Sequence, residues 1–425
     1  MAGPWRGPSS RQWQRNPSHV QWLCSPQSAV WVAEADTALT RTQRHYREGA
    51  AELELGDGFF REQSRPARDL SVLLAADQSD GVGQERGLRW LDLMAGCGIR
   101  ALRWGLEAAG RSAFSPEIWV NDGDPDRSAV LKSNLEGLGQ KGCPLKLFAQ
   151  SAEHLLTRAW LDGDRFDLID LDAFGSPSAL IQPALRALQP EGVLFLASTD
   201  GRSPTGHDRS GAIRRFGATA RVHPASWELA LRHQIGFLAR QAWMLGHGLE
   251  PLLSFSDGRT FRTAVRLRPH PAEAELSSLG LLARCDVCGN QQVQSLLRLR
   301  GWEGCLCPSG SEHLLIHGPL WVGPLQRLDC LRRLRDASVP VAGATRRLLH
   351  RLLADPGSPA RVWSTAELAR RLGLSGPPSV SDLVQTLRDA GQIASVSGVM
   401  GGQIRTNADL QLLLQLCSAV GGKGP

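Results

Sequence analysis

The segment from residue 88 to residue 199 alternates short apolar runs with stretches of helical period, and this alternation constrains the fold more than any other feature of the chain. After the first run, Ile99, Leu102 and Leu106 recur at the spacing of one helix face. Strands that alternate with helices in this way predict a doubly wound parallel sheet. The expected strands lie at 88–94, 118–122, 146–150, 166–172 and 192–199, and further helices at 125–138 and 177–188.

A hairpin is expected to complete this sheet. A loop-rich insertion at 200–225 leads to a long helix at 226–245, and two strand-like runs within 252–268 then flank a Ser-Asp-Gly turn. A parallel sheet that closes with an antiparallel hairpin resembles the class I methyltransferase fold, which is a Rossmann-like α/β fold. Plain dinucleotide dehydrogenases lack that hairpin. Pro269 and Pro271 then mark a boundary.

The length of the chain predicts more than one domain. A sequence of 425 residues accommodates two or three domains. We expect a poorly ordered segment at 1–45, the methyltransferase-like domain at 46–270 and an α+β C-terminal domain at 271–425. The sequence contains no run of about 18 uncharged apolar residues, so no membrane-spanning helix is expected.

The charge balance favours a polyanionic partner. The formal net charge is +6, and 48 residues are basic. Arginine, which suits bidentate phosphate contacts and stacking on bases, dominates this set, although a bias toward arginine codons gives the same composition. Nine unevenly spread cysteines do not form the pattern of a disulfide framework, so we expect the reducing cytoplasm and a metal site. The basic residues that are not arginine are Lys132, Lys141, Lys146 and Lys423.

The stretch DLMAGCGIR (92–100) predicts a cofactor-binding turn between a strand and a helix. Small residues at Ala95, Gly96 and Gly98 let a ligand approach the backbone closely, and the helix start offers free N–H groups. We include Asp92, at the end of the strand, in the cofactor-binding set. A tight turn with no ligand remains an alternative for this stretch.

Asp122 follows the second strand and strengthens the prediction of a nucleoside cofactor. An acid at this sheet position can accept both ribose hydroxyls, because nucleotides lie at the carboxyl ends of the strands. The chain lacks the full G-x-G-x-x-G pattern, which argues for a ligand without a pyrophosphate. S-adenosylmethionine (AdoMet) is such a ligand.

The fourth strand ends in DLDAFGSP (170–177), which predicts a catalytic site at the mouth of the sheet. An exocyclic base amine is a poor nucleophile, and a carboxylate together with a backbone carbonyl can hold it for in-line attack on a methyl group. Asp172 is then the acceptor and base, Ala173 supplies the carbonyl, and Phe174 stacks on the flipped base. Asp170 supports the site from behind. The alternative is that Asp172 caps the following helix.

These motifs identify the chain as similar to the tRNA guanine-26 N2-dimethyltransferases over roughly residues 46–415. Several of the matching stretches are long and specific. They are FFREQSRPARDLSVLLA (59–75), LDLMAGCGIRALRWGLE (91–107), VND (120–122), DLIDLDAFGSP (167–177), STDG (198–201), WELALRHQIGFLAR (227–240), PLLSFSDGRTFRTAVRLR (251–268) and GPLWVGPL (318–325).

The resemblance implies a substrate and further site residues. It implies AdoMet-dependent methylation and dimethylation of guanine 26 in tRNA, and it leaves guanine 27 open, since some bacterial relatives also modify it. Phe59 would stack on the other face of the guanine, opposite Phe174. Arg68 would bind the methionine carboxylate of AdoMet, with Asp69 in the same segment, and Asp122 would hold the ribose. We expect tRNA as the partner of a monomer, with neither DNA nor a membrane.

Three departures from the family pattern bear on the site. Ala173 stands where the family has proline, which keeps the carbonyl but loses the rigid φ. Gln150, Ser151 and Ala152 stand where relatives often have an acid, so backbone groups at Ser151 and Ala152 would hold the adenine. Ala67 replaces an asparagine, which removes one polar contact.

Four cysteines within 23 residues predict a structural tetrahedral Zn²⁺ site. The first two form a C-x-x-C knuckle followed by a glycine. The second pair has one residue between its cysteines, which is less usual, so Cys330 or His313 remains a possible substitute ligand. Free thiols that cluster by chance are the alternative to a metal site. The expected ligands are Cys285, Cys288, Cys305 and Cys307.

The C-terminal region predicts a tRNA-binding module. Residues 331–371 hold nine arginines and three acids. Two helices, at 364–374 and 379–391, precede two short strands within 393–406, which is a winged-helix-like layout over about 360–410. Such a module would hold tRNA by its shape and phosphates, and a protein-contact module is the alternative. Four histidines are interpreted as facing solvent or RNA: His207, His223, His233 and His247.

Three rival functions predict different behaviour. A DNA amino-methyltransferase would share the site chemistry but need a base-reading domain. A non-catalytic tRNA-binding protein would have lost the site, yet Asp172, Phe174, Asp122 and Arg68 are intact. A nicotinamide oxidoreductase would change NADH absorbance and transfer no methyl group.

Overall fold

The computed structural model describes residues 44–80, 86–111, 115–140, 142–305, 307 and 313–421. The predicted N-terminal segment, residues 1–45, therefore lies outside the described residues except for its last two. The chain from Gln43 onward belongs to one compact unit. The domain boundary near residue 270 stays a prediction.

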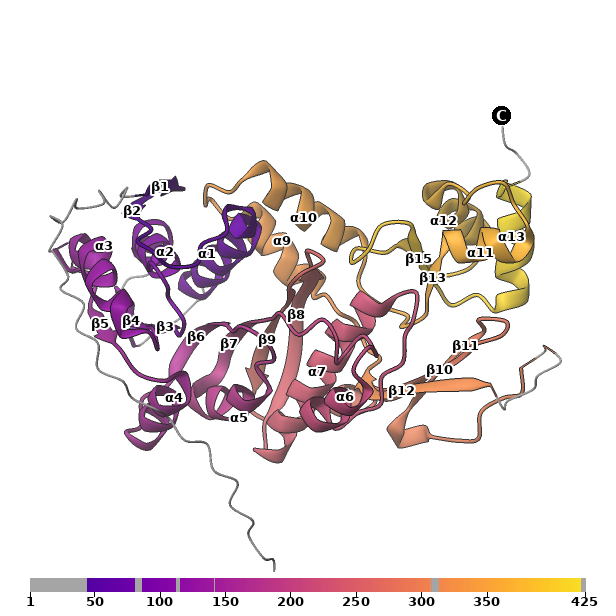
Figure 1. The fold of residues 1–425 in the computed structure, drawn as a ribbon, viewed down its shortest axis with the longest axis horizontal. Coiled ribbons are helices and arrows are strands. Elements are labelled where there is room, and N and C mark those ends of the chain that lie inside the picture. Colours follow the sequence, from indigo (N-terminus) through magenta and orange to yellow (C-terminus); the bar gives the residue numbers. More distant parts are fainter. Residues whose placement is uncertain are drawn as a thin grey trace, which may run out of the picture. The chain divides into compact units, whose positions relative to one another are not determined.

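A seven-stranded sheet forms the centre of the fold, in the order β5-β4-β3-β6-β7-β9-β8 (Figure 1). The first five of these strands run parallel, and β9 pairs antiparallel with both of its neighbours. This confirms the predicted class I methyltransferase sheet with its terminal hairpin. The bounds are β3 Arg89–Asp92, β4 Glu117–Asn121, β5 Leu145–Phe148, β6 Phe166–Asp172, β7 Leu188–Ser198, β8 Gly248–Ser256 and β9 Phe261–Arg268.

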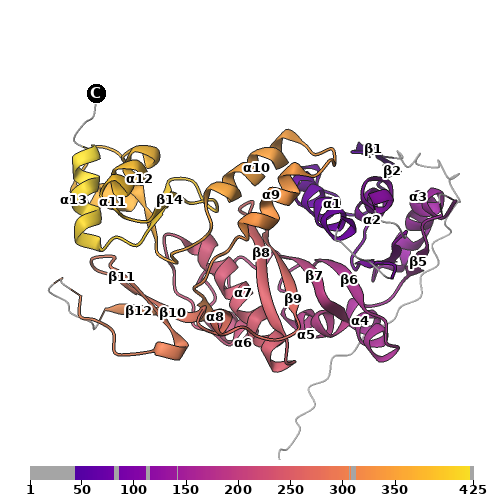
Figure 2. The ribbon, with the colours of Figure 1, turned by 180° about the vertical axis from the view of Figure 1, so that it is seen from behind.

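Helices cover both faces of this sheet (Figures 1 and 2). One layer contains α1, α2 and α3, extended by α9 and α10, and the other contains α4, α5 and α7, with α6 packed on α7. Their bounds are α1 Arg65–Ser79, α2 Ile99–Arg103, α3 Ser128–Gln140, α4 Ala152–Leu161, α5 Ser178–Ala187, α6 Arg209–Phe216, α7 Ser226–Met244, α9 Leu328–Asp336 and α10 Gly343–Ala354.

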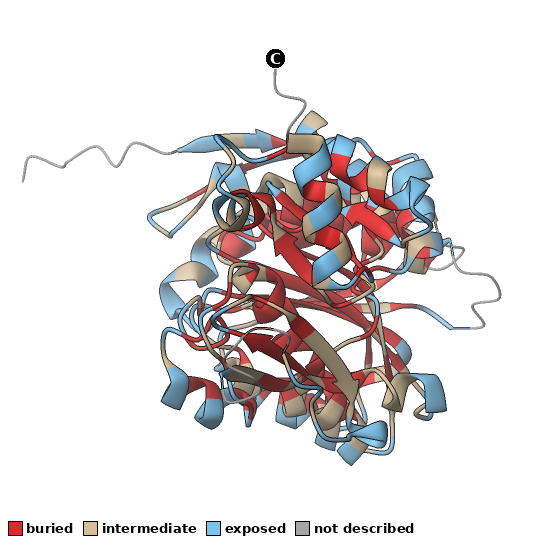
Figure 3. Ribbon diagram, turned by 90° about the vertical axis from the view of Figure 1, so that its right-hand side faces the viewer, coloured by how far each residue is buried: buried red, intermediate tan, exposed pale blue. Residues whose placement is uncertain are grey.

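Alternation along the strands divides the core between these two layers. In β7, Val193 and Phe195 pack with the α1 layer, whereas Leu194 and Leu196 pack with the α5 and α7 layer. Successive side chains of a strand point to opposite faces, and both faces here are covered. Figure 3 accordingly shows the interior of the sheet as buried. Because both faces are buried, the sequence of β7 from Val193 to Ala197 is a continuous apolar run instead of an alternating one.

The turn after β3 places a helix start at the carboxyl edge of the sheet. Gly96 and Gly98 have φ values of +60° and +81°, in the left-handed region that favours glycine. A Cβ on Gly98 would lie 3.0 Å from the side chain of Leu131 on α3, so this position needs the close approach that glycine permits. Helix α2 then begins at Ile99 and continues into a π-helical turn at Trp104–Ala108.

A hairpin that the sequence reasoning did not foresee precedes the first helix. Strands β1 (His45–Glu48) and β2 (Ala51–Glu54) pair antiparallel. Glu48, at the end of β1, is 1% exposed and accepts hydrogen bonds from Arg68 and Arg103. The hairpin therefore supplies the buried counter-charge for two arginines of the α1 layer.

A second, three-stranded sheet carries the cysteine knuckle. Its order is β11-β10-β12, all antiparallel, and the knuckle connects β10 to β11. Helix α8 precedes it. The bounds are α8 Glu273–Leu276, β10 Leu279–Cys285, β11 Gln291–Ser295 and β12 Leu314–Trp321.

The C-terminal part has the predicted winged-helix-like layout of two helices and two strands, with its own apolar core. Two elements were not foreseen: β13, which adds a third strand, and α13, which closes the core. The bounds are β13 Val362–Ser364, α11 Thr365–Leu372, α12 Val380–Asp389, β14 Ala394–Val396, β15 Gln403–Thr406 and α13 Leu410–Gly421.

The interpretation of the histidines is wrong for two of them. His223 is 4% exposed and His233 is 1% exposed, so neither faces solvent or RNA. His317, also 1% exposed, lies with its ring centroid 5.5 Å from that of His223. None of the described helices combines the length and the apolar character that crossing a membrane requires.

Candidate active site

A cavity of about 520 Å³ opens at the carboxyl ends of β3, β4 and β6. Its size lies in the range of pockets that hold small ligands. The structure does not bring Asp92, Gly98 or Ser151 to its wall. The predicted residues that do line it are Phe59, Arg68, Ala95, Gly96, Asp122, Ala152, Asp172, Ala173 and Phe174.

The Asp122 carboxylate is held at one end of this cavity. Its Oδ2 accepts from the Gly96 N–H at 2.7 Å and its Oδ1 accepts from the Asp124 N–H at 2.9 Å. A Cβ built on Gly96 would meet nothing within 4 Å, so the turn leaves open space beside the carboxylate. A rigid carboxylate next to an open glycine turn fits a nucleoside ligand.

Asn121 ties the loops around this end of the cavity together. Its amide donates to the carbonyl oxygens of Leu93 and Gln150, each at 3.0 Å, and its side-chain oxygen accepts from the Gln150 N–H at 3.1 Å. Gln150 is thus held through its backbone, and the adjoining Ala152 lines the cavity. The adenine contact predicted for the backbone at Ser151 and Ala152 stays a prediction.

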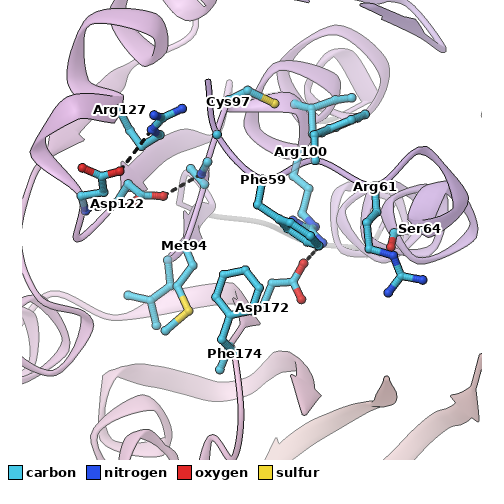
Figure 4. A pocket seen from close by; sticks show the side chains of 18 of the residues that line it. Phe59, Arg61, Ser64, Met94, Cys97, Arg100, Asp122, Arg127, Asp172 and Phe174 are labelled. Atoms are coloured by element: carbon cyan, nitrogen blue, oxygen red, sulfur yellow. Dashed lines mark hydrogen bonds and ion pairs between the residues drawn. The ribbon is translucent and has the colours of Figure 1, made fainter. Parts of the chain in front are cut away.

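Asp172 lies at the end of β6 and contacts two arginines from distant parts of the chain, of which Figure 4 shows Arg100. The Arg100 Nη2 group donates to Asp172 Oδ2, and the Arg262 Nη2 group donates to Oδ1 at 3.0 Å. Burial acts to raise the pKa of Asp172, but the guanidinium groups of Arg262 and Arg100 outweigh it and hold this pKa well below its usual range. The carboxylate is therefore ionised and fixed in orientation.

The helix-cap alternative for Asp172 is wrong. Pro177 occupies the N-cap position of α5, and no side chain caps that helix. Asp172 instead points into the cavity that it lines, beside Phe174 (Figure 4).

Two buried acids lie near Asp172. Asp170 Oδ2 accepts a hydrogen bond from the Ser71 hydroxyl at 2.6 Å and lies 3.2 Å from Arg100 Nε. Burial raises the pKa of Asp170, and burial raises that of Asp92 to about 8. Asp92 and Asp170 are paired in register on neighbouring strands, so both carboxyl groups lie beneath the cavity wall. Asp170 contacts the same Arg100 that contacts Asp172, and its supporting role stays a prediction.

Two exposed phenylalanines stand at the mouth of the cavity. Phe59 is 70% exposed and Phe174 is 76% exposed, and their ring centroids are 5.5 Å apart at an interplanar angle of 72°. A base between them needs about 3.5 Å on each side, so the rings must separate and turn parallel to receive one. Large exposed aromatic side chains on a cavity rim are suited to binding a planar ligand.

The loop that carries Phe174 is anchored despite the loss of proline at position 173. The Gly175 N–H donates to Thr199 Oγ1 at 2.6 Å, and the Gly175 carbonyl accepts from the N–H groups of Thr199 and Asp200 at 2.9 and 3.2 Å. Gly175 has a φ of +75°, which explains glycine at this point of the turn. The hydrogen bonds from the β7 end thus hold the turn that follows Phe174.

Arg68 lines the cavity but is extensively paired. It donates to the Glu48 carboxylate through Nε and Nη2, and to the backbone carbonyls of Arg61 and Glu62 through Nη1 and Nη2. These contacts use four of the five N–H donors of a guanidinium, so one N–H on Nη1 is left for a ligand. The role predicted for Arg68 stays a prediction.

Asp69 does not line the cavity and instead links three elements. It accepts from Arg103 Nη1 at 2.7 Å, from the Ala342 N–H at 2.9 Å and from Thr345 Oγ1 at 2.5 Å. Asp69 is fully buried, so its charge is compensated by these donors. It holds α10 against α1.

Sequence reasoning missed the arginines of the site. Arg100 and Arg262 lie 72 and 90 residues from Asp172, which both contact. No spacing of nearby residues could therefore predict either ion pair. Arg61 and Arg127 also line the cavity. A signal did exist for Arg262, because the hairpin strand that carries it was expected at the edge of the same sheet.

The four predicted cysteines lie close enough together to hold one metal ion. One ligand atom from each of them lies within 4.8 Å of all the others. The Sγ atoms of Cys285 and Cys307 are 3.8 Å apart, the separation expected around a tetrahedral Zn²⁺ with bonds of about 2.3 Å. The Sγ atoms of Cys288 and Cys305 are only 2.8 Å apart, so this pair must separate to bind a metal ion. Cys330 is wrong as a substitute ligand, because it is buried in the core of the α1 layer. His313 is not part of the cluster and pairs with Asp286.

Known proteins are similar to this chain in sequence and in fold. The family model described as N2,N2-dimethylguanosine tRNA methyltransferase matches residues 54–418. The tRNA (guanine(26)-N(2))-dimethyltransferase of Methanocorpusculum labreanum is 28% identical over 361 residues, which cover 84% of this chain and 88% of the relative. The protein of the same name from Pyrobaculum neutrophilum is 31% identical over 269 residues, covering 63% of this chain and 67% of the relative.

A solved structure has the same fold. Trm1 from Pyrococcus horikoshii with S-adenosyl-L-methionine aligns with a TM-score of 0.73 at 22% identity, and the alignment covers 88% of this chain and 99% of that chain. This similarity confirms the predicted fold class, and the family model extends over most of the described residues. The chain therefore belongs to the N2,N2-dimethylguanosine tRNA methyltransferase family.

Proposed function

We propose that this protein transfers methyl groups from AdoMet to N2 of guanine 26 in tRNA, and that it forms N2,N2-dimethylguanosine. One observation supports this most directly: an ionised and doubly clamped carboxylate, Asp172, lies beside two exposed phenylalanines at the mouth of a nucleoside-sized cavity. Membership of the family and the names of its relatives supply the nucleotide position.

The cofactor end of the cavity lies at the ends of β3 and β4. Asp122 would hold the ribose, the backbone at Gly96 would approach the ligand closely, and the remaining N–H of Arg68 would contact the methionine carboxylate. When bound, AdoMet supplies an electrophilic methyl group on a sulfonium. The carboxylate and glycine donors fit the ribose and the small groups of this ligand.

Asp172 would orient the guanine amine. Its oxygens are held by Arg100 and Arg262, so the carboxylate can accept an amine N–H without reorganising. Phe59 and Phe174 would clasp the base from its two faces. The fixed hydrogen bond and the two rings together aim the N2 lone pair along the line of attack.

The same carboxylate can take the proton that N2 releases. The arginines make Asp172 a weak base, since they hold its pKa below the usual range. A weak base suffices here, because a nitrogen whose lone pair is delocalised into the ring gives up its proton readily once it is methylated. Orientation is therefore the larger part of the role of Asp172.

A second transfer needs one remaining N–H and room for the first methyl group. Monomethylguanine keeps one amine N–H for Asp172 to accept. Ala173 and Gly175 are small, and a Cβ on Gly175 would meet nothing within 4 Å. The loop thus leaves space for the first methyl group to turn away from the attacking line.

We further propose a structural Zn²⁺ held by the four-cysteine cluster. Thiolates are the ligands that Zn²⁺ prefers, and four of them leave no open position for catalysis. The knuckle joins two strands of a small sheet, so the metal would stabilise the fold there.

The experiment that tests the main proposal is transfer of tritiated methyl groups to two matched tRNA transcripts, one with guanine and one with adenine at position 26. Label on the guanine transcript, and N2,N2-dimethylguanosine in its nucleoside digest by mass spectrometry, is the expected result. Residual label on the adenine transcript would assign guanine 27. Label found as N1- or N7-methylguanosine, or outside positions 26 and 27, would contradict the proposal.

A further inference from the structure

A second groove adjoins the mouth of the guanine pocket. Its walls are the start of α1, the turn of the β8–β9 hairpin, helix α10 and the turn at 399–401 between β14 and β15. The groove has a volume of about 440 Å³. Ser64 lines both the groove and the active-site cavity, so the two are neighbours.

Two arginines without partners line this groove. Arg347 and Arg351 are spaced one helical turn apart on α10, and both are exposed. Within the described part of the chain, neither guanidinium has a hydrogen-bond or ion-pair partner. On the neighbouring helix α9, Arg333 pairs with Asp77 and Arg335 pairs with Asp336.

One acid lines the groove, and it is already engaged. Asp257 Oδ1 accepts from the N–H groups of Arg259 and Thr260, at 3.0 and 2.8 Å, within the hairpin turn. This carboxylate therefore closes a turn and has no ion-pair partner among the described arginines. The arginine pair leaves the groove with an excess of positive charge.

The position of the groove suits the nucleic-acid strand that carries the target base. Figure 4 shows Arg61 and Ser64 on the side of the cavity opposite Asp122, beyond Phe59. The order from the cofactor end is thus the Asp122 carboxylate, the guanine site, Arg61 and Ser64, and then the groove. A base that is flipped into a pocket leaves the phosphates of its strand at the pocket mouth, next to whatever surface adjoins it.

We propose that this groove binds the tRNA backbone beside the flipped guanine, with Arg347 and Arg351 contacting phosphate oxygens. The inference rests on the proposed function and adds the surface that holds the substrate. Guanidinium groups match phosphate in a bidentate geometry, and an unpaired pair one turn apart can contact one phosphate or two neighbouring ones. Because the turn at 399–401 forms one wall, the winged-helix-like part and the methyltransferase sheet hold the same strand.

The test is tRNA binding by the full-length double variant Arg347→Ala/Arg351→Ala at several salt concentrations. We expect the Kd for tRNA to rise at least tenfold, and the slope of log K against log salt to become shallower by about 1.5, as for two lost phosphate contacts. The Kd for AdoMet and the kcat at saturating tRNA are expected to stay within about twofold, because neither arginine lines the active-site cavity.

Two further variants separate charge from structure. Arg346→Ala is the matched control, since Arg346 is exposed on the same helix but donates to the Val341 carbonyl at 2.9 Å and does not line the groove. It should bind tRNA as the unaltered chain does. The double variant Arg347→Lys/Arg351→Lys should keep most of the salt dependence, because it keeps the positive charges.

Three outcomes would overturn the inference: wild-type affinity in the double variant, weaker binding with an unchanged salt slope, or equal losses in Arg346→Ala. Failure of the proposed function has a different signature. The unaltered chain would then leave tRNA unmethylated, whatever the variants do.

Discussion

At the scale of single residues, the site depends on how one carboxylate is held. Asp172 lies between guanidinium groups from α2 and β9, which fix its orientation and keep it ionised. Removing the charge leaves the arginines in place but weakens the acceptor that we propose for the amine. Chemistry and cofactor binding should therefore separate in variants at this position.

Asp172→Asn tests that separation. We expect single-turnover methyl transfer to fall at least 100-fold, with the Kd for AdoMet within about threefold, because the amide lacks the charge that orients the amine. Asp162→Asn, an exposed carboxylate after α4, is the matched control and should behave as the unaltered chain. Near-normal turnover in Asp172→Asn would remove Asp172 from the mechanism.

Phe174→Leu and Phe59→Leu test the clasp on the base. Each removes a ring and keeps an apolar side chain, and stacking is worth about 1–3 kcal/mol per base. We expect KM for tRNA to rise roughly 5- to 150-fold, with unchanged AdoMet affinity, measured by steady-state transfer. If AdoMet affinity falls instead and KM for tRNA holds, the rings belong to the cofactor site.

At the scale of elements, the cysteine knuckle is tied to the winged-helix-like part. Arg371 on α11 donates to the Val287 carbonyl, inside the knuckle, at 2.8 Å. Its other Nη group contacts Glu367 at 2.6 Å, and Glu367 also pairs with Arg284 on β10. The shape of the knuckle therefore helps to hold α11 against the small sheet.

Zinc removal tests this coupling. Freshly purified protein should contain about one zinc per chain. Chelation, or Cys288→Ser, should speed amide hydrogen exchange in α11 and in β10 while leaving the Kd for AdoMet unchanged, because the knuckle is remote from the cavity lining. Cys417→Ser, a cysteine outside the cluster, is the control for zinc content. Metal analysis without zinc would end this proposal.

At the scale of the whole molecule, a buried ion cluster connects α7 to the C-terminal part. Arg405 on β15 donates to both oxygens of Glu228 on α7 at 2.7 Å, and to Asp355 at 2.8 and 3.0 Å. Arg232 also pairs with Glu228. All four residues are at most 1% exposed, so each charge depends on the others.

Arg405→Met should destabilise the protein strongly, because it leaves Glu228 and Asp355 with uncompensated charge. We expect the free energy of unfolding in urea to fall by about 3–5 kcal/mol. Arg335→Met, on the exposed face of α9, should leave it unchanged. An equal, small effect in the two variants would show that the cluster is not a stabilising link.

The buried residues His233 and His317 should make the folded protein less stable in mild acid. Burial, aided by neighbouring positive groups, lowers the pKa of His317 to about 4 and that of His233 to about 3. Their ordinary pKa is about 6.5, so between pH 4 and 6.5 the unfolded chain binds protons that the folded chain does not, and stability falls as the pH drops. Above pH 6.5 both histidines are neutral in the folded and the unfolded chain, so they no longer make stability depend on pH.

His317→Gln should flatten this pH dependence. In urea titrations between pH 5 and 6, the free energy of unfolding should change less steeply than in the unaltered chain, by about 1.2 kcal/mol per pH unit. The slope is independent of any constant destabilisation by the substitution. A variant in which His154, an exposed histidine on α4, is replaced by glutamine should keep the original slope. An unchanged slope in His317→Gln would contradict a neutral buried His317.

Residues close together in the sequence determined the parallel sheet, its hairpin, the glycine turn and the cysteine knuckle. These features depend on residues close in sequence, because strand and helix periodicity repeat within a few positions. Asp122 and Asp172 were found for the same reason, since each ends a strand that the pattern already predicts. The resemblance to a family added Phe59 and Arg68.

The tertiary structure alone decided which charges meet. The pairs Arg100–Asp172, Arg262–Asp172 and Arg405–Glu228 join residues 72, 90 and 177 positions apart. Such pairs depend on strand order, register and the faces that helices present, and a one-residue shift in register would move each side chain to the other face. Spacing along the chain carries no record of these choices, so the clamp on Asp172 and the groove beside it became visible only in the folded molecule.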